Sequence, residues 1–90
     1  MPLASMTRST NGVVKAAPGM LGGVVLTAGS DAATAVVYDS SSEASGPILC
    51  RLAAAANTTS PVVFVDEVAV SKGLYAAVTG TGASVSLYYA

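Results

Sequence analysis

The C-terminal stretch Ser71–Tyr89 constrains the fold of this chain more than any other part of the sequence. Its residues alternate between apolar and more polar positions with a period of two, which is typical of strands that bury one face. The two sets of inward side chains are Leu74, Ala76 and Val78 on the first segment and Ala83, Val85, Leu87 and Tyr89 on the second. Between them, Thr79–Gly82 contains two glycines that can adopt positive φ, as a tight turn requires. The stretch therefore predicts a β-hairpin at the centre of the fold.

Shorter segments with strand character precede it, separated by turn residues. Strands are expected at Gly12–Ala17, Met20–Thr27, Thr34–Asp39, the run Ile48–Asn57 and Val62–Val70, the last interrupted at Asp66-Glu67. In Ile48–Asn57, leucine and four alanines favour a helix, but alternation and the neighbouring strands favour a strand. About seven short strands with turn signals roughly every 8–12 residues predict an all-β fold, a single small antiparallel β-sandwich of the jelly-roll or Ig-like type.

The first eleven residues have no periodicity and predict an extended N-terminal arm, residues 1–11, ahead of a sandwich domain at residues 12–90. An arm of this kind is disordered unless something holds it. Its apolar side chains and its one charge are therefore the candidate interface residues. They are Met1, Leu3, Met6 and Arg8.

Charged residues make up only 10% of the 90-residue chain, while apolar residues reach 52%. Ordinary soluble domains carry about 25% charged residues. One reading is a domain whose surface is built from Ser, Thr and Gly. The other is that part of the surface is covered by further copies of the chain or by a larger partner. A domain this small also gains little stability from burying its own core, and a single cysteine allows no internal disulfide. Association is therefore the expected source of added stability.

The formal net charge of −1 provides no field that would attract nucleic acid or an acidic membrane. The longest apolar run, Gly19–Ala28, is about half the length that a membrane-spanning helix needs. It could serve as the core of a signal peptide, with Arg8 and Lys15 before it. However, the segment ahead of it is long and polar, so a core strand is favoured.

Candidate chemistry is sparse. The absence of histidine excludes nucleophile–histidine pairs. Cys50 lies in an apolar strand and is interpreted as a structural thiol, and the adjacent Asp66 and Glu67 would face opposite sides of a strand. Asp39 and Glu43 could offer oxygen ligands to calcium, but their spacing matches no EF-hand loop. We therefore expect no catalytic residue, cofactor or metal. Four tyrosines, which could stack on sugars or fill an interface, are Tyr38, Tyr75, Tyr88 and Tyr89.

The order of segments resembles a group of small virion proteins of tailed phages, the capsid decoration or cement proteins. The residues that carry the resemblance are Val36-Val37-Tyr38-Asp39, the Ser/Gly-rich loop, Ile48-Leu49-Cys50-Arg51-Leu52 before the alanines, Lys72-Gly73-Leu74-Tyr75, Val78-Thr79-Gly80-Thr81-Gly82 and the closing Val-x-Leu-Tyr-Tyr. The likeness covers roughly residues 12–89, and its motifs consist of strand and turn residues rather than catalytic signatures.

The resemblance implies a β-sandwich on the outside of a phage head, bound to the major capsid protein and made in the host cytoplasm. It also implies a homo-oligomer, for which a trimer would suit a capsid symmetry axis. An alternative is a carbohydrate- or receptor-binding module of a head fibre, neck or tail, which would need exposed aromatic residues beside polar loops. A module of a bacterial surface protein is a further alternative and would require secretion.

Overall fold

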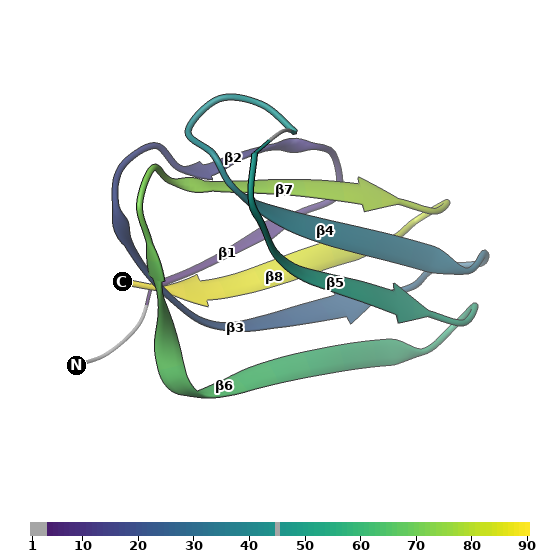
Figure 1. Ribbon diagram of the computed structural model, residues 1–90. Coiled ribbons are helices and arrows are strands. Elements are labelled where there is room, and N and C mark those ends of the chain that lie inside the picture. The colour runs from purple at the N-terminus through teal and green to yellow at the C-terminus, as the bar shows by residue number, and fades with distance from the viewer. Residues whose placement is uncertain (1–3, 45) are drawn as a thin grey trace.

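The computed structural model describes residues 4–44 and 46–90, with residues 64–67 described through their backbone alone. Every regular element in this part of the chain is a β-strand (Figure 1). The strands are β1 (Ala4–Arg8), β2 (Gly12–Lys15), β3 (Gly19–Thr27), β4 (Ala33–Asp39), β5 (Ile48–Ala54), β6 (Thr59–Val70), β7 (Leu74–Thr79) and β8 (Ser84–Tyr89).

These strands form two four-stranded antiparallel sheets. Sheet A has the order β1-β8-β3-β6, and sheet B has the order β2-β7-β4-β5. The pairs β1–β8, β2–β7, β3–β6 and β4–β5 show that the chain folds like one long antiparallel hairpin, wrapped so that its strands alternate between the sheets. Eight strands in this order make a jelly roll. The all-β sandwich prediction is confirmed, and the jelly roll is the type that the strand order selects.

The predicted C-terminal hairpin is wrong, although both of its strands form. β7 lies in sheet B and β8 in sheet A, so the two strands do not pair. The turn between them carries the chain from one sheet to the other. Their inward residues face each other through the core rather than lying side by side. The turn between them uses Gly80 (φ 118°) and Gly82 (φ 72°), and the Ala83 N–H donates to the Gly80 carbonyl at 3.2 Å. Alternation reveals which face of a strand is buried, but it does not reveal the strand's neighbours.

The chain's one hairpin between consecutive paired strands within the described residues joins β4 and β5 through the serine-rich loop 40–47. Ile48–Ala54 is a strand, as predicted, despite its alanines. β6 is assigned as one continuous strand, yet its pairing with β3 shifts register between the pairs Leu21–Val68 and Gly23–Val63. The interruption expected near Asp66-Glu67 is thus an irregularity in the ladder and does not end the strand.

The core lies between the sheets and consists of small residues packed against larger ones. Leucines and valines supply its fully buried volume, and alanines from β4 and β7 let the sheets approach. Leu87 is completely buried, as predicted. The largest fully buried side chains are Leu21, Leu26, Leu74, Leu87, Val24, Val37 and Val85.

Candidate functional site

Few charged side chains stand on the outer faces of the two sheets among the residues whose side chains the structure describes. Most described charged side chains stand in loops or on the last residue of a strand, and these are Arg8, Lys15, Asp31, Asp39, Glu43 and Lys72. Arg51, in the middle of β5, is the exception. A surface that must remain in water is normally about a quarter to a third charged. The sheet faces are therefore the candidate functional surfaces of this molecule.

On the outer face of sheet B, four apolar or aromatic side chains form a row across all four strands. The strand registers place Val13 opposite Tyr75, Tyr75 opposite Tyr38, and Tyr38 opposite Ile48. Leu49 is the extra residue of a β-bulge, which brings Ile48 into the row with 42% of its surface exposed. We call these four residues the sheet B row.

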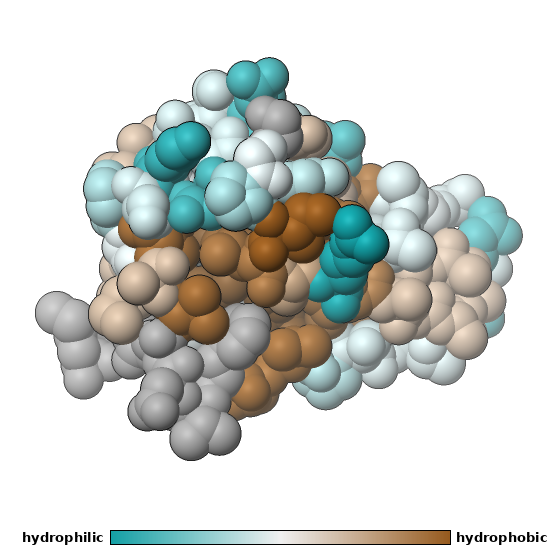
Figure 2. All heavy atoms as spheres, in the orientation of Figure 1, coloured by the Kyte–Doolittle hydropathy of each residue, from teal (hydrophilic) through white to brown (hydrophobic). Residues whose placement is uncertain are grey.

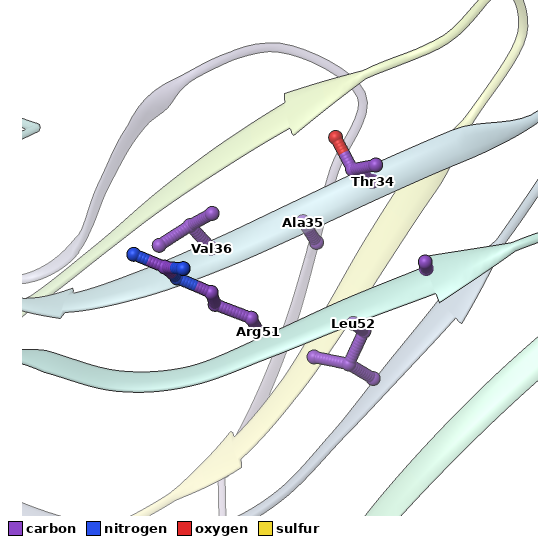
Figure 3. Close-up of a pocket in the computed structure, with 6 residues that line it drawn as sticks. Thr34, Ala35, Val36, Arg51 and Leu52 are labelled. Carbon is purple, nitrogen blue, oxygen red and sulfur yellow. The ribbon is translucent and has the colours of Figure 1, made fainter.

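Beside the sheet B row lies a second cross-strand set, in which Val36 stands opposite both Ala77 and Arg51. A shallow hollow of about 410 Å³ lies here, lined by Thr34, Ala35, Val36, Arg51, Leu52 and Ala53. In Figure 3 the Arg51 side chain reaches back over β4 toward Val36. Figure 2 shows hydrophobic residues gathered below a hydrophilic loop and extending down toward β6. The hollow thus has apolar walls and one positive charge.

The outer face of sheet A is dominated by hydroxyl groups. Thr7 on β1 and Ser86 on β8 are hydrogen-bonded at 2.7 Å between their side-chain oxygens. Its exposed large apolar groups are Met20, Tyr88 and the 80%-exposed Val63, and Gly23 stands between Tyr88 and Val63. Among the described side chains, the row through Tyr88 is therefore interrupted at Gly23.

Asp39, at the end of β4, is buried, and its carboxylate holds the turn between β6 and β7. Oδ1 accepts the backbone N–H groups of Lys72 at 2.8 Å and Gly73 at 3.4 Å, and Oδ2 accepts that of Ser71 at 3.1 Å. These bonds, that from Lys72 most strongly, keep the pKa of Asp39 below its ordinary value against the opposing effect of burial. Both carboxylate oxygens thus accept backbone N–H groups of this turn. Among the described residues, no three metal-ligating side chains gather.

Cys50 is half-buried and packs against the core. Burial raises the pKa of its thiol to about 11. Thiolates are the reactive form of cysteine, so this environment keeps the thiol protonated and fits the structural interpretation of Cys50.

The structure corrects the predicted N-terminal arm. Residues 4–8 form strand β1, which pairs with β8 along its whole length, so they belong to the sandwich and the proposed boundary between residues 11 and 12 does not separate two parts. Sequence reasoning missed this because Met6 is the single large apolar side chain of β1. It lies opposite Leu87 and packs against the core, so removing β1 would uncover an edge of β8.

The candidate interface residues are accordingly placed differently from what the sequence predicted. The Arg8 guanidinium donates to the carbonyls of Thr10 at 3.2 Å and Asn11 at 3.5 Å. Asn11 in turn accepts the N–H of Val78 through its side-chain oxygen at 2.8 Å. Arg8 and Met6 therefore have partners within the chain, while Met1 and Leu3 lie outside the described residues.

The sheet B row was missed at the sequence level for a different reason. Alternation around Leu74 and Ala76 already places Tyr75 on the outer face, but only the strand order brings it beside Tyr38. Of the other tyrosines, Tyr88 lies on the outer face of sheet A and Tyr89 packs against the core. In the part of the chain that the structure describes, no helix is long and apolar enough to cross a bilayer. Searches of family models, curated proteins and solved structures found no match to this chain.

Proposed function

We propose that this protein is a non-enzymatic structural component of a phage virion, a decoration or cement protein that binds the outside of the head and stabilises joints between major capsid subunits. It would be made in the host cytoplasm and act as one of many copies on the capsid. A ligand that binds only the folded, assembled form of its partner stabilises that form by mass action. The function requires binding surface and no catalytic residues.

The observation that carries the proposal is the scarcity of charge among the outward side chains that the structure describes on the two sheets. These are mainly apolar or hydroxyl-bearing, and the described charged side chains stand mainly at strand ends and in loops. Apolar residues with few charges are typical of surface that is buried in a permanent interface. The jelly roll adds support because this architecture recurs in viral capsid domains and in lectins. The resemblance in sequence points to the capsid.

The alternative function is a carbohydrate- or receptor-binding module of a head fibre, neck or tail. The cross-strand pair Tyr38–Tyr75, beside an open hollow, is the observation that favours it. Aromatic faces can stack on sugar rings, but recognition of the hydroxyl groups also needs precisely placed polar side chains. Thr34 and Arg51 are the polar residues that line the hollow, and no described acidic side chain lies there. Protein binding therefore fits this surface better.

The test is binding to purified heads of the phage that encodes the chain, after any copies of the protein have been removed. We expect the added protein to co-sediment with heads at a saturating, fixed stoichiometry, and to raise the temperature at which the heads release DNA. Light scattering of the free protein would show whether it binds as a monomer or as a trimer. If it fails to co-sediment but binds a glycan on an array, the alternative replaces the proposal.

A further inference from the structure

We propose that the outer face of sheet B is the docking face, and that its partner presents an apolar surface with an acidic side chain opposite Arg51. This inference rests on the proposed function and specifies which surface performs it. The face joins the sheet B row to the adjoining Val36 and Ala77 without an intervening polar residue, because these positions are neighbours in the strand registers. The apolar area is thus continuous across four strands.

The opposite face provides the comparison that favours sheet B. In the corresponding row of sheet A, Ser5 lies opposite Tyr88, and Gly23 separates Tyr88 from Val63. The hydroxyl-bearing Thr7, Thr27, Ser84 and Ser86 lie on the same face together with Val25 and Pro61, and the 40%-exposed Met20 lies opposite Ala69 at the start of β3. Hydroxyl groups form hydrogen bonds with water or with one another, as those of Thr7 and Ser86 do. Among the described side chains, the row through Tyr88 is thus interrupted, whereas the sheet B row is not.

Arg51 identifies the chemistry of the partner. Its side chain lies over β4 at the border of the hollow (Figure 3), and no described carboxylate pairs with it. Burying an arginine without an opposite charge is strongly unfavourable. A two-fold dimer built on this face would bury two arginines, because each copy would present the same patch without a described carboxylate. A partner of different sequence that supplies a carboxylate resolves this problem, whereas a second copy does not.

The size of the face is sufficient for one such contact. The molecule measures 34 × 26 × 18 Å along its principal axes. A face spanned by the two longer dimensions is of the same order as the roughly 800 Å² that each partner contributes to an interface of standard size. One sheet face can thus support specific binding, provided that most of it is covered.

The experiment compares matched substitutions on the two faces, using full-length protein and stripped phage heads. Arg51→Glu and Tyr75→Ser alter sheet B, while Thr27→Glu and Tyr88→Ser make the equivalent changes on sheet A. Thermal melts show that each variant is folded, and Arg51→Gln replaces Arg51→Glu if the latter is not. We expect Arg51→Glu to reduce head occupancy about tenfold or more, because it sets two negative charges against each other. Tyr75→Ser should weaken binding severalfold, and the sheet A variants should bind as the wild type does.

Three results would overturn the inference. Loss of head binding confined to Thr27→Glu and Tyr88→Ser would show that sheet A docks while the proposed function stands. Light scattering that shows wild-type oligomers, dispersed by Arg51→Glu, would identify a second copy as the occupant of sheet B. Failure of the wild type itself to occupy heads would remove the proposed function, and glycan binding lost in Tyr75→Ser would then assign the face to a sugar.

Discussion

The two ends of the sandwich are held together by different kinds of interaction. At the end where β3 turns into β4 and β5 into β6, the loops bond through their backbones (Figure 1). The Ala28 N–H donates to the Thr58 carbonyl at 2.9 Å, and the Asn57 N–H donates to the Gly29 carbonyl at 2.8 Å. We call this the glycine end, because Gly29 packs directly against the β7–β8 turn.

At the opposite end, a side chain adds its own hydrogen bonds to backbone bonds such as that from the Asp39 N–H to the Pro47 carbonyl at 2.8 Å. The buried carboxylate of Asp39 accepts three N–H groups from the turn between β6 and β7. We call this the carboxylate end. Backbone bonds and close packing do not titrate, whereas a carboxylate does. The comparison teaches that acid should weaken the carboxylate end, whereas crowding tests the packing at the glycine end.

A substitution in the core between the two ends should have the largest effect on the free energy of unfolding, and the effects at the ends are compared with it. Leu87 is fully buried in the middle of β8, next to β1 and β3. Leu87→Ala should lower the free energy of unfolding by about 2–5 kcal/mol, because it leaves a cavity that two sheets cannot close. Denaturant unfolding of the purified protein measures this. A loss below about 1 kcal/mol would mean that the core collapses around the missing side chain.

The sequence predicted the strands well and their partners poorly. Alternation identified the inward residues of β7 and β8, since a period of two is a local property. Pairing is a long-range property, as β1 and β8 illustrate by joining the two ends of the chain. The glycines at 80 and 82 predicted a sharp turn correctly, but the same turn can return a strand to its own sheet or carry it to the other sheet.

The candidate site was predictable only in part, for the same reason. The low charge of the sequence is enough to indicate a covered surface. However, Arg51 differs from the other charges whose side chains the structure describes only in standing mid-strand on an outer face, which depends on the fold. From the sequence, Asp39 was considered only as a possible calcium ligand, because its hydrogen-bond partners at Ser71–Gly73 lie more than thirty residues away along the chain. Short alternating segments such as Ala4–Arg8 contain too little apolar area to be recognised as edge strands.

The second prediction tests the glycine end by crowding. A β-carbon on Gly29 would collide with the Thr81 carbonyl oxygen and come within 2.9 Å of the Gly82 backbone. Because backbone atoms cannot rotate away, Gly29→Ala should cost about 1–3 kcal/mol. Gly23→Ala is the control, since its nearest neighbour would be the Val62 carbonyl at 3.2 Å. Equal melting temperatures for the two variants would show that the loops at this end move apart easily.

The third prediction tests the carboxylate end at neutral pH. In Asp39→Asn one oxygen is replaced by an NH₂ group, which cannot accept a hydrogen bond from the N–H groups of Ser71 or Lys72. Leaving such donors unpaired costs about 1–3 kcal/mol, so the variant should unfold at lower denaturant concentration. Asp31→Asn, in an exposed turn at the glycine end, is the matched control and should behave like the wild type. A stable Asp39→Asn variant would mean that water replaces the carboxylate without loss.

The last prediction is the smallest and separates the ends by pH alone. The pKa of Asp39 is lowered in the folded state, mainly by the Lys72 N–H, from a reference value of 3.8. Its contribution to stability is therefore complete above pH 3.8 and is lost as the pH falls below that value toward the folded-state pKa. Melting temperatures measured from pH 6 down to about pH 2 should fall more steeply for the wild type than for Asp39→Asn. For a domain of this size, about 1 kcal/mol corresponds to a 4–8 °C shift, so the difference is measurable. The melting temperature of Gly29→Ala should be lower than that of the wild type at every pH and should fall with the same slope. The reason is that Gly29 packs against backbone atoms, which do not titrate. Parallel curves for the wild type and Asp39→Asn would show that the carboxylate end is no more sensitive to acid than the glycine end.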